Sequence, residues 1–318
     1  MPDPAAPEPL AVCETAARAG GGVLLDWVGR FRATTKGPRD LVTEADYASQ
    51  KEIRRIVSEA FPHHGFVGEE ADSDESQPPS GSPGHAGTGT RWIVDPLDGT
   101  TNYVHGFPAW CVSIALATGD DILAATIYDP LRDECFTARA GGGCFLNGEP
   151  IRTAAVVDPA EAIAALSFPP QVATDSPAVA DFLAILPHVH SVRRTGSTAL
   201  NLAWLASGRL HAFWARRIAC WDAAAGFLLV TEAGGAVAPF AAPGGNVPLD
   251  DPAFVAAATP DLLAAMRESG LAEFAQGLSD VASGAFRAAS ALFGLDAVER
   301  QRQAASEALA RRRQRLST

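Results

Sequence analysis

WIVDPLDGTT, the stretch from Trp92 to Thr101, sets the organisation of the chain. Its first three residues form an apolar run that predicts a buried strand, and the polarity changes abruptly at Asp95. The proline that follows disfavours helix and gives no N–H to a sheet, so a turn is expected there. Such a turn would bring the carboxylates of Asp95 and Asp98 and the carbonyl of Leu97 toward one small volume. Oxygen ligands of this kind suit Mg²⁺, so the stretch predicts a magnesium site at the end of a strand.

The residues after the turn, Gly99 and Thr100, stand where a helix can start, and the free N–H groups of a helix start can hold a phosphate. Taken alone, Asp-Pro and Asp-Gly pairs are ordinary surface-turn chemistry. Three further acidic segments favour the metal interpretation. They are Gly68-Glu69-Glu70, which follows an apolar pair, residues 40–46, which lead into a helix, and Asp222, which opens another helical pattern.

Three motifs together resemble the inositol monophosphatase family. They are GEE at residues 68–70, WIVDPLDGTTNYVHGFP at residues 92–108 and CWDAAAGFLLVTEAGG at residues 220–235. The resemblance covers roughly Leu10 to Glu268, and the two long motifs are far more specific than a lone glycine pattern. It implies an α/β fold, a layered αβαβα sandwich, usually dimeric. It also implies lithium-sensitive hydrolysis of small phosphate monoesters with two or three Mg²⁺ ions.

The resemblance assigns roles to residues of this chain. Metal ligands are expected at Glu69, Asp95, the Leu97 carbonyl, Asp98 and Asp222. Glu69, Asp95 and Leu97 would hold a first ion, and Asp95, Asp98 and Asp222 a second. Substrate contacts are expected at Asp98, Gly99, Thr100, Gly196, Ser197, Thr198 and Asp222.

Catalytic roles are expected at Asp46, Thr100 and Glu69. Asp46 and Thr100 would together orient a water and draw its proton, and Glu69 would act through the first ion. From the local sequence alone, Asp46 and Asp222 are equally well explained as helix-capping residues. Lys36 falls where the family has a loop lysine near the metals.

The chain departs from the family pattern at Ala215. The inositol-specific members carry a glutamate there, seven residues before the aspartate of the Cys-Trp-Asp motif, and it accepts hydrogen bonds from inositol hydroxyls. A methyl group cannot do so, which leaves the substrate open. Arg216 and Arg217 follow, and a solvated surface is the favoured interpretation, with contact to an anionic substrate as the alternative.

Composition bounds the function classes. With 318 residues, of which 47% are hydrophobic, the chain can bury a large core. No run approaches the roughly 18 apolar residues of a membrane span, and the start lacks a signal-peptide pattern, so a cytoplasmic protein without membrane contact is expected. The five cysteines show no CxxC spacing, which argues against a zinc site. The net charge of −12 argues against nucleic-acid binding.

Hydrophobic periodicity predicts two α/β halves and an extension. Residues 1–150 would form the half with most metal ligands, including a polar loop at 71–90 that could act as a lid, and residues 151–270 the second half. Residues 271–318 read as a helical, Arg-rich extension. Expected helices cover 10–31, a segment after Thr43, 197–206 and 222–232. Expected strands cover 66–67, 92–94, 111–117, 122–128, 134–138, 191–194, 210–214, 236–240 and 254–258.

The predicted activity is Mg²⁺-dependent hydrolysis of a small phosphate monoester, with a small phosphorylated substrate and a homodimer as partners. Within this class, histidinol phosphate, a sugar bisphosphate and a nucleotide 3′-phosphate are alternative substrates. Outside it, the chain could be a catalytically silent, dimeric interaction protein. A silent protein has no chemical need for so many carboxylates together, so the enzyme is favoured.

Overall fold

The computed structural model describes residues 7–37, 40–70, 89–169, 171–216, 218–240 and 245–271. Most of the predicted loop, residues 71–88, and of the predicted extension, residues 272–318, lies outside these ranges. The lid and the tail therefore stay predictions.

A seven-stranded sheet forms the first half, with strand order β3-β4-β5-β6-β7-β8-β9. Strands β3 and β4 are parallel and every other neighbouring pair is antiparallel, as a meander of hairpins requires. The strands are β3 (Gly65–Gly68), β4 (Thr90–Asp98), β5 (Cys111–Thr118), β6 (Asp121–Asp129), β7 (Glu134–Arg139), β8 (Gly143–Leu146) and β9 (Glu149–Pro150).

Strand β4 does not end at Val94, as the sequence predicted, but continues to Asp98. Asp95 pairs with Ser113 and Asp98 with Cys111, so three steps along β4 lie opposite two along β5. One extra residue is therefore accommodated as a β-bulge. The proline falls inside the bulge, where no ladder N–H is needed, and this explains why it does not stop the strand.

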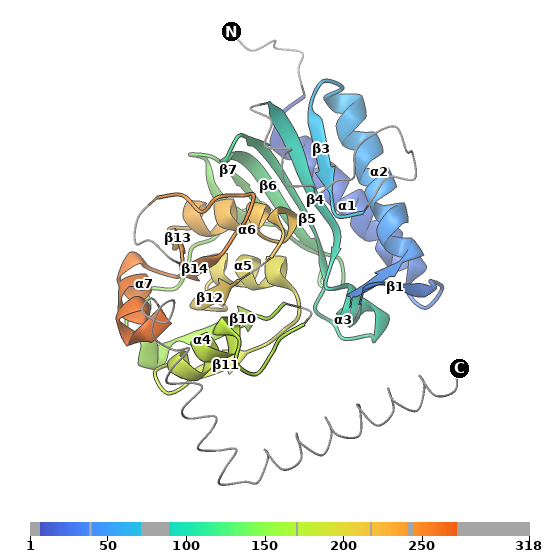
Figure 1. Ribbon diagram of the computed structural model, residues 1–318. Coiled ribbons are helices and arrows are strands. Elements are labelled where there is room, and N and C mark those ends of the chain that lie inside the picture. Colours follow the sequence, from blue (N-terminus) through green and yellow to red (C-terminus); the bar gives the residue numbers. More distant parts are fainter. Residues whose placement is uncertain are drawn as a thin grey trace, which may run out of the picture.

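Helices α1 (Pro9–Trp27) and α2 (Glu44–Ala60) cover one face of this sheet (Figure 1). The predicted capping box at the start of α2 is present. The Gly20–Gly22 run does not interrupt α1, because two of its glycines give room to neighbours. A Cβ on Gly20 would lie 2.7 Å from Ile53, and one on Gly21 would lie 2.6 Å from Tyr128.

The second half contains a five-stranded mixed sheet of order β11-β10-β12-β14-β13. Its strands are β10 (Ile163–Ser167), β11 (Ser191–Arg193), β12 (Ala212–Ala215), β13 (Ala236–Pro239) and β14 (Phe254–Ala257). Helices α5 (Thr198–Ala206) and α6 (Cys220–Glu232) lie between the two sheets, and α4 (Pro177–Ile185) and α7 (Pro260–Met266) lie on the outer side (Figure 1). The layers are therefore α, β, α, β and α.

Buried apolar side chains fill the spaces between layers. One cluster joins α1 and α2 to the first sheet, and another joins α4 and α7 to the second. The central cluster contains α5 and α6 together with side chains of both sheets, from Ile93 and Phe136 to Phe213 and Phe254. Because this core is shared, the elements that carry the acids of the two halves are held in one packed unit.

Smaller elements complete the structure. They are the hairpin of β1 (Ala33–Gly37) and β2 (Asp40–Thr43), the short helix α3 (Thr100–Val104), a 3₁₀ turn at Pro159–Glu161 and a π-helical turn at Arg267–Leu271. The Gly and Pro content of residues 35–40 predicts a loop, but the structure places residues 35–37 in β1 and Asp40 in β2, so that prediction was wrong for these residues. Within the described ranges, none of the helices has the length and apolar character needed to cross a membrane.

Candidate active site

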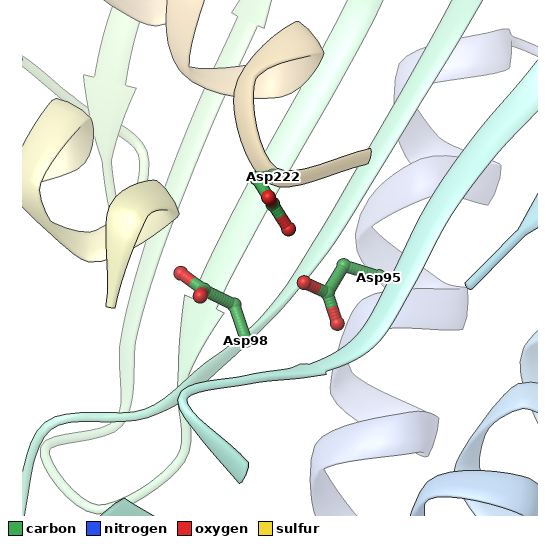
Figure 2. Close-up of side chains that lie close together, drawn as sticks. All are labelled: Asp95, Asp98 and Asp222. Carbon is green, nitrogen blue, oxygen red and sulfur yellow. The ribbon is translucent and has the colours of Figure 1, made fainter. Parts of the chain in front are cut away.

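Three carboxylates meet where the two halves join (Figure 2). One oxygen from each of Asp95, Asp98 and Asp222 lies within 4.8 Å of the others. Asp95 and Asp98 flank the bulge of β4, and Asp222 comes from the first turn of α6, about 120 residues later in the chain. The bulge matters because it changes the alternation of side chains, so that both strand acids face the same space.

Each of the three carboxylates is oriented by a donor on its own or a facing element. Asp95 Oδ1 accepts a hydrogen bond from the Leu97 N–H at 2.9 Å. Asp98 Oδ2 accepts from the Ser197 hydroxyl and from the Ala199 N–H, both at 2.6 Å. Asp222 Oδ2 accepts from the Ala219 N–H at 3.0 Å, so it caps α6 and also belongs to the cluster.

The cluster is electrostatically unfavourable without a counter-charge. Burial, the charge of Glu69 and mutual repulsion raise the pKa of Asp95 well above its usual value, and burial with the facing carboxylates does the same for Asp222. Burial raises the pKa of Asp98 to about 6, although its hydrogen bonds to α5 act in the opposite sense. Buried carboxylates of this kind are stabilised by a bound cation.

A cavity of about 400 Å³ opens beside the cluster. Its lining includes Glu69, the three aspartates, Leu97, Gly99, Thr100 and Gly196, which are all residues that the sequence analysis singled out. Glu69 follows β3, and its N–H donates to the Val94 carbonyl at 3.1 Å, which ties the end of β3 to β4. The structure thus places all five expected metal-ligand residues around one space.

Lys36 reaches the site from the hairpin. Its Nζ lies 3.0 Å from Glu69 Oε1 and 2.5 Å from Glu70 Oε1. Burial lowers the pKa of Lys36, but the two glutamates raise it by more, so the pKa lies above its usual value. Burial also raises the pKa of Glu70 to about 7. The contact with the almost fully buried Glu70 is a feature that the sequence analysis missed.

Asp46 and Thr100 lie together, as the family resemblance implied. The Thr100 hydroxyl is 3.2 Å from Asp46 Oδ1 and 3.1 Å from the Leu97 carbonyl oxygen. The other oxygen of Asp46 accepts from the N–H and the hydroxyl of Thr43, at 2.9 and 2.6 Å. The aspartate therefore caps α2 and contacts Thr100 at once, so the two explanations weighed for it are compatible. Burial raises its pKa to about 6.

The structure changes the role expected for Ser197, in the segment before α5. Ser197 is fully buried and its hydroxyl is committed to Asp98, so it is a support for that carboxylate and not an exposed substrate contact. The Thr198 hydroxyl pairs with that of Ser167 at 3.0 Å, although Thr198 lines an adjoining cavity. Gly196 has a φ of +90°, and Asn102 lies 2.9 Å from the position a Cβ would take there.

Asn102 also links the two halves beside the site, which the sequence analysis missed. Its Nδ2 donates to the carbonyls of Ala109 and Thr195, at 2.6 and 2.9 Å. Gly99, with a φ of +96°, has the Ala109 carbonyl oxygen 2.8 Å from the position of a Cβ. A side chain at Gly99 would disturb the turn that carries Thr100.

Ala215, at the end of β12, is fully buried within the central core. It lines neither cavity of the site, so it supplies no acceptor for a substrate hydroxyl. Arg216 is not a solvated surface residue as expected: it forms a two-point ion pair with the buried Asp181 and lies 3.7 Å from the Phe240 ring centroid. Arg217 lies outside the described residues.

Comparison with known proteins identifies the family. The match to the inositol monophosphatase family covers residues 7–272. The chain belongs to the inositol monophosphatase family. This confirms the resemblance seen in the three sequence motifs, and the layered α/β fold agrees with it.

Relatives in this family carry two kinds of name. The chain is 37% identical over 236 residues to an inositol-1-monophosphatase of Rhizobium meliloti, covering 73% of this chain and 85% of the relative. It is 38% identical over 229 residues to the Nus factor SuhB of Xylella fastidiosa, covering 71% and 79%.

Solved structures of the family agree with the fold. The extragenic suppressor protein suhB of Bartonella henselae matches with a TM-score of 0.71 at 34% identity, covering 82% of this chain and 97% of that one. The inositol monophosphatase of Anabaena matches with a TM-score of 0.67 at 30% identity, covering 81% and 93%.

Proposed function

We propose that this chain is a Mg²⁺-dependent phosphatase that hydrolyses a small phosphate monoester by direct attack of water. The observation that carries the proposal is the convergence of Asp95, Asp98 and Asp222 from two halves of the fold on one space. Family membership supports the same reaction class, since relatives named inositol-1-monophosphatase cover most of the chain.

The donor set fits Mg²⁺. All the candidate ligands offer oxygen, the acids are largely buried, and one oxygen from each of the three aspartates lies within 4.8 Å of the others. Hard divalent cations prefer such ligands. We assign Glu69, Asp95 and the Leu97 carbonyl to one ion and Asp95, Asp98 and Asp222 to another, with a third as an option. When bound, Mg²⁺ supplies positive charge to the phosphate oxygens and acidifies a water for attack.

The residues of the chain position the reacting groups. Thr100 can orient a water through its hydroxyl, because Asp46 Oδ1 lies within hydrogen-bond distance behind it. Asp46, with its pKa raised to about 6, is suited to draw a proton near neutral pH. Gly99 and Thr100 line the cavity and would place the phosphate beside the carboxylates. Ser197 keeps Asp98 in position from the facing half.

The substrate is proposed as a class and not as a compound. Inositol 1-phosphate is one candidate. However, this chain has the buried Ala215 at the position where inositol-specific members carry a glutamate that accepts hydrogen bonds from the inositol hydroxyls. Histidinol phosphate, a sugar bisphosphate and a nucleotide 3′-phosphate stay as alternatives. A homodimer is expected because the family is usually dimeric.

The test is phosphate release from these substrates and glycerol 2-phosphate, measured with Mg²⁺ and with EDTA. We expect release from at least one substrate with Mg²⁺ and none with EDTA. A folded protein that releases no phosphate from any of them would favour the silent interaction protein. Sedimentation of the same preparation tests the dimer.

A further inference from the structure

Arg194 stands at the mouth of the proposed active site. It lies between the end of β11 and the start of α5, and its side chain is exposed. It lines both the cavity beside the three aspartates and an adjoining cavity of about 310 Å³, which is also bounded by Phe168 and Trp221. Among the described residues that line either cavity, Arg194 is the only one with a cationic side chain.

The guanidinium of Arg194 is available for a ligand. Arg132, Arg209 and Arg216 are each paired with a carboxylate. Arg194 has no ion pair or hydrogen bond to any residue in the described part of the chain. Its Nη1 lies 3.1 Å from the position that a Cβ on Gly196 would take, so the glycine leaves room for the guanidinium at the cavity wall.

A free guanidinium at this place has a specific chemistry. Its planar fork of N–H donors matches a carboxylate or a phosphate and binds either through two hydrogen bonds. The cluster of carboxylates and its ions would take the phosphate that is hydrolysed, so a second anionic group on the rest of the substrate can reach the arginine. The buried alanine at position 215 supports the same conclusion, because the site lacks the acid that would favour a neutral polyol.

We propose that Arg194 recognises a second anionic group, a phosphate or a carboxylate, on the part of the substrate that leaves after hydrolysis. The inference rests on the proposed phosphatase function and names its substrate class. Preferred substrates are then phosphate monoesters that carry a further anion, and Arg194 is a specificity-determining residue.

The test compares substrates in matched pairs. Fructose 1,6-bisphosphate against fructose 1-phosphate tests a second phosphate, and 3-phosphoglycerate against glycerol 3-phosphate tests a carboxylate. In each pair, the ratio of kcat/KM for the doubly anionic compound to kcat/KM for its partner is measured with saturating Mg²⁺. We expect a ratio above ten in at least one pair for the native protein, and the pair that shows it identifies the anion.

The variant Arg194→Gln should lower that ratio by about ten- to a hundredfold, the usual effect of losing a charged hydrogen-bonding partner. Arg194→Lys should retain part of the preference for the doubly anionic compound, because the positive charge is kept and the planar set of guanidinium donors is lost. Arg193→Gln is the matched control. This neighbour is exposed, lines neither cavity and, among the described residues, bonds only to the Val192 carbonyl, so the ratio should not change.

The possible outcomes separate the two proposals. An unchanged ratio in Arg194→Gln, an equal fall in Arg193→Gln, or a native ratio near one in both pairs would overturn the role of Arg194 while leaving phosphatase activity intact. Absence of phosphate release from all four compounds would overturn this inference. If the substrates named for the proposed function also released no phosphate, the proposed function would be overturned with it.

Discussion

Replacing Ser197 by alanine removes a hydrogen-bond donor from the proposed metal site without changing a proposed ligand. The Ser197 hydroxyl lies 2.6 Å from Asp98 Oδ2 and also accepts from the Leu200 N–H at 3.2 Å as the cap of α5. A hydrogen bond to a charged group is worth about 1.5–3 kcal/mol and a helix cap about 1 kcal/mol. Since the two share one hydroxyl, we expect the free energy of unfolding to fall by about 2–3 kcal/mol.

The same change should weaken Mg²⁺ binding. The Ser197 hydrogen bond lowers the pKa of Asp98, which nevertheless stands at about 6 because the group is buried. Losing about 1.5–3 kcal/mol of preference for the charged form would raise that pKa by about one to two units. Mg²⁺ must then displace a proton at pH 7, so its affinity should fall up to about tenfold.

Urea unfolding and calorimetric Mg²⁺ titration measure the two effects. Ser176→Ala is the matched control, because Ser176 caps α4 but contacts no carboxylate of the cluster. The control should lose about 1 kcal/mol or less and bind Mg²⁺ like the native protein. Native Mg²⁺ affinity in Ser197→Ala would refute the reasoning that Asp98 depends on this hydroxyl.

Three further predictions concern pH, lithium and substrate preference. In the folded, metal-free protein the pKa of Asp46 and of Asp98 is raised to about 6, so the stability that their protonated forms contribute is lost as pH rises through 6. Mg²⁺ should offset this loss, so the rise in Tm on adding Mg²⁺ should be larger at pH 7 than at pH 5. The same rise in Tm at both pH values would contradict this prediction. Lithium at tens of millimolar, roughly where its weaker hold on carboxylates becomes effective, should inhibit phosphate release, and full activity there would argue against the assignment. Since buried Ala215 offers no acceptor, kcat/KM for inositol 1-phosphate should exceed that for glycerol 2-phosphate by no more than about tenfold, and a strong preference would show that another residue supplies the acceptor.

Most residues that the structure brings together in the candidate site could be predicted from the sequence, because their signals are local. Asp95, Asp98 and Thr100 lie within six residues of one another, and the cap of α2 can be read from Thr43 and Asp46. The acid of α6 was found from its motif. The layered architecture, by contrast, was predicted from the family resemblance and not from hydrophobic periodicity.

The features that the sequence did not predict depend on contacts between distant segments. Ser197 lies 99 residues from Asp98, so its support of that carboxylate has no local signal. The Pro96 bulge depends on the register with β5, which a single strand cannot show. Strand β10 was missed because its Ile-Ala-Ala-Leu-Ser sequence has no strand-specific pattern, and it forms between two parallel partners.

The most direct test of the metal-centred reaction is phosphate release by Asp95→Asn at saturating Mg²⁺. Asp95 is assigned to both ions, so a neutral amide should weaken both sites and reduce turnover to background while the fold is kept. The exposed Asp121 at the start of β6 provides the matched control, Asp121→Asn, which should retain native turnover. Turnover by Asp95→Asn equal to that of the native protein would contradict a reaction centred on these carboxylates.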